Sequence, residues 1–121
     1  MSMNLYVEGT HTTTVKVKGK RKTITDRTKF SLWQTPTKLT YEVLALPTVE
    51  QQVKAYICWV DSASKPYEDN VYDFSAPLDE NFEYPVIGRE MVNPAQEHTV
   101  ELHKWLKMCE DEDYTVEFYT V

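Results

Sequence analysis

The chain has 121 residues, of which 41% are hydrophobic and 12% aromatic, and it carries a formal net charge of −6 at pH 7. This length is typical of one domain and the aromatic content exceeds that of most disordered chains, so we expect residues 1–121 to fold as a single domain around one core. No apolar run approaches the roughly 18 residues of a membrane span, and the start MSMNLYVEG lacks the regions of a signal peptide, which predicts a cytoplasmic protein with no membrane partner.

The N-terminal third predicts a β-hairpin. Residues 4–8 and 12–18 are rich in β-branched and aromatic side chains, and valines alternate with lysines from residue 15 to residue 18. This alternation is typical of a strand with one face toward the core. A turn at residues 18–21, which contains Gly19, would return the chain into a second strand at residues 23–25.

Two helices are predicted next. Thr35 has the properties of an N-cap with Pro36 at the first helical position, and this helix should end near Ala45. Thr48 begins a capping-box spacing, which predicts the start of a second helix. The apolar side chains of that helix lie on one stripe of a 3.6-residue repeat: Val49, Val53, Tyr56, Ile57 and Val60. A strand at residues 55–60 is the alternative, because that window is β-branched and aromatic.

The C-terminal half predicts a loop, a helix and a strand. Prolines and acidic residues interrupt the aromatic side chains of residues 65–93, so we expect a long ordered loop there. Asn93 and Pro94 repeat the capping pattern, and an apolar stripe predicts a helix that continues to about Cys109. Residues 114–121 alternate as a final strand.

Together these elements predict an α+β fold. We expect the N-terminal hairpin and the C-terminal strand to form a small antiparallel sheet, with about three helices packed on one face of it.

Charge is distributed unevenly along the chain. Residues 1–29 have a net charge of +5, residues 30–66 are neutral overall, and residues 67–121 have a net charge of −11. The basic side chains gather at the predicted hairpin turn: Lys16, Lys18, Lys20, Arg21 and Lys22. Such a tip could contact nucleic-acid phosphates, resist aggregation as a solvated strand end, or meet the acidic half of its own chain or of a second copy. Because a net charge of −6 repels nucleic acid, we expect no nucleic-acid binding tighter than the non-specific range of about 10⁻⁴ to 10⁻⁶ M.

The candidate binding surface is the acidic and aromatic segment at residues 67–84. Six carboxylates and five aromatic rings occur there with no basic side chain. Aromatic rings are common anchors at protein interfaces, and carboxylates steer a basic partner. The alternative is a loop folded over the core, with each ring filling a groove. The candidate residues are Tyr67, Asp69, Tyr72, Asp73, Phe74, Asp79, Glu80, Phe82 and Tyr84.

Other kinds of site have weaker support in the sequence. Cys58 and Cys109 fall in apolar helical patterns, which predicts buried, unreactive thiols in a reducing cytosol, with a disulfide between them as the alternative. The acidic residues lack the spacing of a calcium loop, and His98, His103 and Cys109 lack that of helical zinc ligands. With three glycines in the chain there is no Gly-rich phosphate loop either. We therefore expect no metal, no cofactor and no enzymatic activity.

The run HTTTVKVKGKRKTI at residues 11–24, followed by LWQTPT at residues 32–37, resembles small accessory proteins of tailed phages that infect marine cyanobacteria. The resemblance covers about the first half of the chain and contains no catalytic motif. It implies expression in the cytoplasm of an infected bacterial cell, and it implies no particular chemistry.

These observations predict a non-enzymatic binding protein that occupies a basic surface of a host protein. The contact would use residues 67–84 and the acidic run at residues 110–113. A nucleic-acid-associated protein that uses the basic hairpin at residues 16–22 is the alternative, and an enzyme of unrecognised type is the third reading. A homo-oligomer is compatible with each of these.

Overall fold

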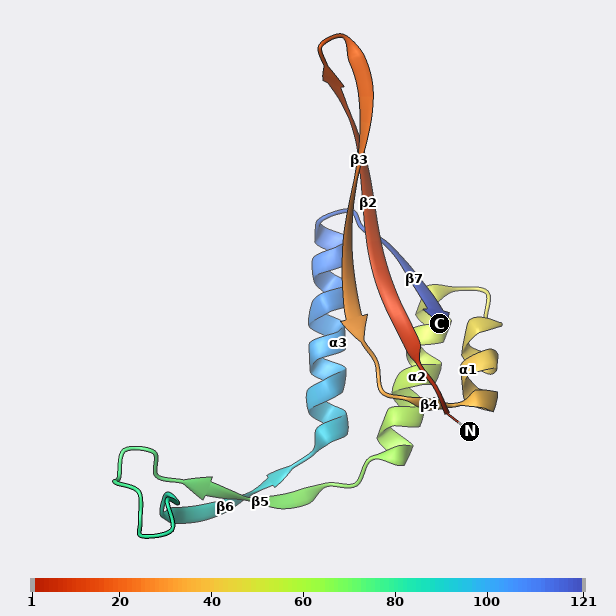
Figure 1. Ribbon diagram of the computed structural model, residues 1–121. Helices are drawn as coiled ribbons and strands as arrows, with labels where there is room; N and C mark the ends of the chain where they lie inside the picture. Colours follow the sequence, from red (N-terminus) through yellow and green to blue (C-terminus); the bar gives the residue numbers. More distant parts are fainter. Residues whose placement is uncertain (1, 121) are drawn as a thin grey trace.

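The computed structural model describes residues 2–120 and has an α+β fold (Figure 1). The predicted fold class is confirmed. The helices are Thr37–Leu44 (α1), Val49–Ala63 (α2) and Pro94–Asp111 (α3). The strands are Ser2–Met3 (β1), Leu5–Val17 (β2), Lys20–Ser31 (β3), Thr35–Pro36 (β4), Tyr67–Tyr72 (β5), Val86–Val92 (β6) and Thr115–Thr120 (β7).

The central sheet is antiparallel, with the strand order β3-β2-β7. Lys18 and Gly19 connect β2 to β3 with φ angles of 52° and 79°, the signs of a two-residue type I′ turn. The predicted hairpin and its pairing with the C-terminal strand are therefore confirmed, except that Val121 lies outside the described residues. β2 pairs with β7 only from Leu5 to Thr10, so the rest of the β2–β3 hairpin continues as a two-stranded ribbon beyond β7.

The core lies between one face of this sheet and the three helices. Leu5, Val7 and Gly9 alternate with less buried residues along β2, as the period of a strand requires. Val7 pairs with Phe118 of β7, so both side chains lie on the same face. Leu5, Val7 and Phe118 form one buried cluster with residues of all three helices: Val43 of α1, Val53, Tyr56 and Val60 of α2, and Ala95 and Leu102 of α3.

Side-chain caps explain where two of the helices begin. Thr48 accepts a hydrogen bond from the backbone N–H of Gln51, and Asn93 accepts one from that of Gln96, as predicted. Residues 55–60 are helical, so the strand alternative for this window is wrong.

No helix in the described part of the chain is long and apolar enough to cross a membrane.

The prediction that Thr35 caps the first helix is wrong. Thr35 belongs to β4, which pairs with β1, and its side chain is buried. Pro36 occupies the cap position of α1, and no side-chain hydrogen bond caps this helix. The hydroxyl of Thr35 instead bonds to that of Thr40, which donates to the carbonyl oxygen of Pro36.

Residues 65–93 do not form the long loop that the sequence predicts. β5 and β6 pair antiparallel from Tyr67 opposite Val92 to Tyr72 opposite Val86, and only residues 73–85 between them are irregular. We call residues 65–93 the arm. Figure 1 shows the arm extending away from the helices and the central sheet, at the end of the molecule where α2 ends and α3 begins.

Candidate functional site

The arm has both faces open to solvent. Only Val71 of β5 and Val92 of β6 are partly buried, and every other residue of these strands is exposed. Ile87 and Met91 each expose 66% of their surface. A two-stranded hairpin of this kind is at best marginally stable by itself in water. Large apolar side chains gathered on such an element are typical of a surface that binds a partner.

Two aspartates organise the irregular tip of the arm. The carboxylate of Asp73 accepts hydrogen bonds from the hydroxyl and the backbone N–H of Ser75, which lower the pKa of Asp73. Oδ1 of Asp79 accepts the backbone N–H groups of Asn81 at 2.8 Å and of Glu83 at 3.0 Å. The tip therefore has a defined backbone conformation, although most of its side chains are exposed.

Phe82 has an unusual conformation within this tip. Its φ angle is 61°, and its side chain is 82% exposed. Positive φ is uncommon for residues other than glycine, and a residue held there costs of the order of 1 kcal/mol or more. Asp79 maintains this conformation, because its carbonyl oxygen accepts the Phe82 N–H at 3.0 Å while its N–H donates to Glu83 at 2.9 Å. The tip thus holds a large ring out in solvent at a cost in backbone energy.

The aromatic side chains of the tip surround a hollow of about 370 Å³. It is lined by Tyr72, Phe74, Phe82, Glu83 and Tyr84. Phe74 and Tyr84 meet edge to face with ring centroids 5.0 Å apart, and Tyr72 lies 6.2 Å from Phe74. The structure therefore brings together four of the five aromatic residues that the sequence predicts for the site. Aromatic faces beside a carboxylate suit a lysine or arginine side chain.

The other predicted site residues have different places. Tyr67 and Asp69 lie near the base of the arm, and Asp69 is directly opposite Glu90. Like charges opposite each other on neighbouring strands destabilise a hairpin. Glu80 is exposed at the tip, whereas Asp73 and Asp79 shape the tip as described above.

The acidic run at residues 110–113 does not join the arm in one surface, contrary to the expectation. The arm leads into the first turn of α3, and the acidic run lies at the last turn of this 18-residue helix. At 1.5 Å per residue the two acidic segments are roughly 27 Å apart along the helix axis.

Sequence reasoning missed three residues of the arm: Glu83, Ile87 and Met91. Glu83 lines the hollow, and the two apolar side chains are exposed on β6. The β-branched pair at residues 86–87 directly after Pro85 is a weak strand signal that could have located β6. No sequence signal shows that its apolar side chains would face solvent.

The basic hairpin lies at the opposite end of the molecule from the arm (Figure 1). Lys16, Lys18, Lys20, Arg21 and Lys22 are all exposed on the ribbon that extends beyond β7, and none of them forms an ion pair within residues 2–120. The ribbon also exposes 50% of Val17 and 43% of Ile24. The hairpin therefore does not fold against the acidic half of its own chain, one of the alternatives left open by the sequence.

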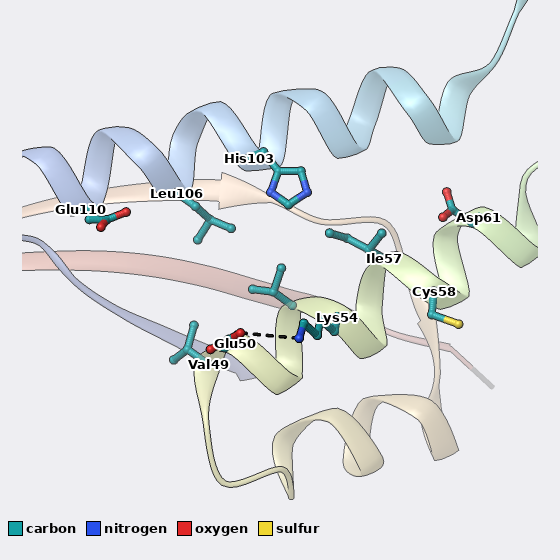
Figure 2. Close-up of a pocket in the computed structure, with 10 residues that line it drawn as sticks. Val49, Glu50, Lys54, Ile57, Cys58, Asp61, His103, Leu106 and Glu110 are labelled. Carbon is teal, nitrogen blue, oxygen red and sulfur yellow. Dashed lines mark ion pairs between the residues drawn. The ribbon is translucent and has the colours of Figure 1, made fainter.

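A second hollow lies between α2 and α3 and has a volume of about 760 Å³. Figure 2 shows apolar side chains such as Val49, Ile57 and Leu106 along it, with charged and polar groups at its margin. Lys54 and Glu50 form an ion pair at 3.5 Å on this margin. A groove of this size and lining could accept an apolar ligand.

The groove also contains Cys58, which is exposed, so the prediction that both cysteines are buried is wrong for this residue. Cys109 is buried, and both thiols are free. Burial, and secondarily the nearby Glu112, raise the pKa of the Cys109 thiol. The two cysteines therefore have different environments, and only Cys58 is accessible to solvent.

Within residues 2–120, no three His, Cys, Asp or Glu side chains are grouped so that they could hold a metal ion. No protein-family model, no curated protein and no solved structure matches the chain.

Proposed function

We propose that this chain is a non-enzymatic binding protein, and that the tip of the arm is its contact surface. The observation that carries the proposal is Phe82, which is 82% exposed and held at a φ of 61° beside three other aromatic rings. A folded domain that leaves Phe74 and Phe82 mostly exposed, and that also holds Phe82 in an unfavourable conformation, is expected to use these rings elsewhere.

The charge of the arm defines the partner. Residues 67–84 carry six carboxylates and no basic side chain. A basic protein surface would be attracted to this segment over several ångströms and would then place a lysine or arginine over the rings. The contact would combine burial of the rings with charge pairing at the rim, which is the usual anatomy of a protein interface.

The resemblance to phage accessory proteins supplies the context of this proposal. Inside an infected bacterial cell the basic surface would belong to a host protein in the cytoplasm. The chain would then act by occupying that surface, with no chemical step of its own.

Site-specific photocrosslinking tests the proposal. A photoreactive phenylalanine analogue at Phe82 should form covalent adducts with the partner in cells, because this ring would lie inside the interface. The matched control is the same analogue at Tyr41 of α1, which is 59% exposed but lies outside the arm. Adducts are read as shifted bands on a denaturing gel and identified by mass spectrometry.

Equal adduct patterns from the two positions, or no adduct from Phe82, would overturn the proposal. The patterns would then report chance encounters of exposed rings, and the arm would have no special role.

A further inference from the structure

The arm and the basic hairpin match each other in chemistry. Residues 67–84 carry six acidic side chains, and residues 16–22 carry five basic ones. The arm offers an aromatic hollow with Glu83 in its wall, and the hairpin offers unpaired Lys and Arg side chains. Both elements also expose apolar side chains, Phe82 on the arm and Val17 and Ile24 on the hairpin.

The two elements cannot meet within one chain. They extend from opposite ends of α3, whose 18 residues separate their bases by roughly 27 Å (Figure 1). Residues 11–17 of β2 then continue roughly 23 Å further from the arm, at 3.3 Å per residue. Of the ion pairs in residues 2–120, none joins the hairpin to the arm.

We propose that the basic surface bound by the arm is the β2–β3 hairpin of a second copy of this chain. The inference rests on the proposed role of the arm as a contact surface, and it replaces the host protein by a second copy of this chain as the partner. Lys20, Arg21 and Lys22 of one copy enter the acidic, aromatic tip of the next, where the rings and Glu83 accept a cation.

The contact is heterologous, because it joins two different surfaces. A dimer formed by one such contact still has one unused hairpin and one unused arm, so association continues head to tail until the copies close into a ring or extend as a filament. Charge complementarity favours this occupant of the hairpin over nucleic acid. Each copy carries one acidic tip and one basic hairpin, so the two surfaces are always present at equal concentration. A polyanion such as nucleic acid is instead repelled by the net charge of −6.

Two variants each remove one surface. The hairpin variant carries Lys20→Thr, Arg21→Thr and Lys22→Thr, since β-branched threonine suits an exposed strand. Its control replaces three exposed helical lysines, Lys38, Lys54 and Lys107, by alanine.

The arm variant neutralises acids that do not shape the tip: Asp69→Asn, Glu80→Gln, Glu83→Gln and Glu90→Gln. Asp69 Oδ1 accepts the N–H of Asn70, a role that an asparagine oxygen can keep. The side-chain carboxylates of Glu80, Glu83 and Glu90 make no ion pair and no hydrogen bond within residues 2–120. Its control neutralises four exposed acids of α3: Glu97, Glu101, Glu110 and Asp111.

Sedimentation of the purified full chain measures association directly. At low salt the average mass should rise when the protein concentration is increased about a hundredfold. At about 0.5 M salt the Debye length is only about 4 Å, so the average mass should fall toward that of the monomer. Each variant should weaken association by about tenfold or more, equivalent to about 1.4 kcal/mol, while both controls associate like the wild type. An equimolar mixture of the hairpin and arm variants should form a 1:1 dimer and nothing larger, because one intact hairpin meets one intact arm.

A wild type that stays monomeric at low salt, or a mixture that stays monomeric, overturns the inference. The inference is also overturned if the wild type binds a short DNA duplex at micromolar affinity and the hairpin variant does not. The hairpin would then be a nucleic-acid-binding surface. Failure here is distinct from failure of the proposed function. If the analogue at Phe82 crosslinks to another protein and never to a second copy, the arm keeps its proposed role and only the identity of its partner changes.

Discussion

His98 of α3 lies among aromatic rings that limit its access to water. Its ring stacks on Trp33 with centroids 4.8 Å apart and lies 5.6 Å from the ring of Phe30. Nε2 is 2.7 Å from the hydroxyl of Tyr56, and this hydroxyl accepts the backbone N–H of Trp33 at 2.8 Å. Burial lowers the pKa of His98 and raises the pKa of Tyr56 to about 12. Because the hydroxyl has no other acceptor within residues 2–120, we assign its proton to the bond with a neutral His98.

This arrangement predicts that acidification from about pH 7 to about pH 5.5 destabilises the protein. The folded pKa of His98 lies below its ordinary value of about 6.5, so between these two pKa values the unfolded chain binds a proton that the folded chain does not. The contribution of His98 is fully present above about pH 6.5 and is lost as the pH falls toward the folded pKa. Urea unfolding at a series of pH values measures the free energy of unfolding.

Two variants identify the group that titrates. His98→Gln should remove the dependence on pH in this range, whereas His103→Gln, at an exposed position of the same helix, should leave it. A wild-type free energy of unfolding that does not change over the range would contradict the assignment.

Cys58 illustrates what the sequence can predict for single residues. The apolar stripe correctly predicts Val53, Tyr56 and Val60 as core residues of α2. Consecutive residues of a helix differ by about 100° around its axis, so Cys58 points away from that stripe although its neighbours Ile57 and Trp59 touch the core. The prediction placed Cys58 within the apolar helical pattern of its neighbours, but the helical period turns its side chain away from the buried stripe, and it is exposed.

At the scale of elements, Gly9 determines how closely the end of α3 approaches β2. A Cβ atom at this position would lie 3.0 Å from Sγ of Cys109 and 3.2 Å from Cγ2 of Thr28. Both neighbours belong to regular elements, and Cys109 is fully buried. Gly9→Ala should therefore lower the free energy of unfolding by about 1–3 kcal/mol through overpacking.

Gly88 in the arm provides the matched comparison. A Cβ atom there would meet no atom within 4 Å, so Gly88→Ala should change stability by less than about 0.5 kcal/mol. Urea unfolding of both variants measures these changes in the free energy of unfolding. Equal effects of the two substitutions would show that the packing of α3 on β2 does not restrict the side chain at residue 9.

The starts of α2 and α3 were predictable because local signals determine where these two helices begin. Thr48 and Asn93 each cap a helix with their own side chains, and both appear in the sequence at the right place. The arm was not predictable in this way. A strand with one buried face alternates apolar and polar residues, but β5 and β6 cover no core and have no such pattern. The four prolines around them indicated a loop, although Pro66 and Pro85 stand just outside the strands.

For the whole molecule, the sequence predicts the separation of charge but not its geometry. The blocks of +5 and −11 are evident in the order of residues. Whether they neutralise each other depends on α3, which places the arm and the hairpin at opposite ends (Figure 1). The sequence also named most residues of the aromatic hollow, but the backbone of Phe82 and the role of Asp79 emerge only from the fold.

The central claim is that the acidic arm serves an external partner and does not stabilise its own chain. The melting temperature of the arm variant tests this most directly, compared with the α3 control at concentrations where the protein sediments as a monomer. We expect the arm variant to have an equal or higher melting temperature than the wild type, because Asp69 and Glu90 no longer repel each other across the two strands. A fall of about 4 °C or more, which corresponds to about 1 kcal/mol in a domain of this size, would contradict it.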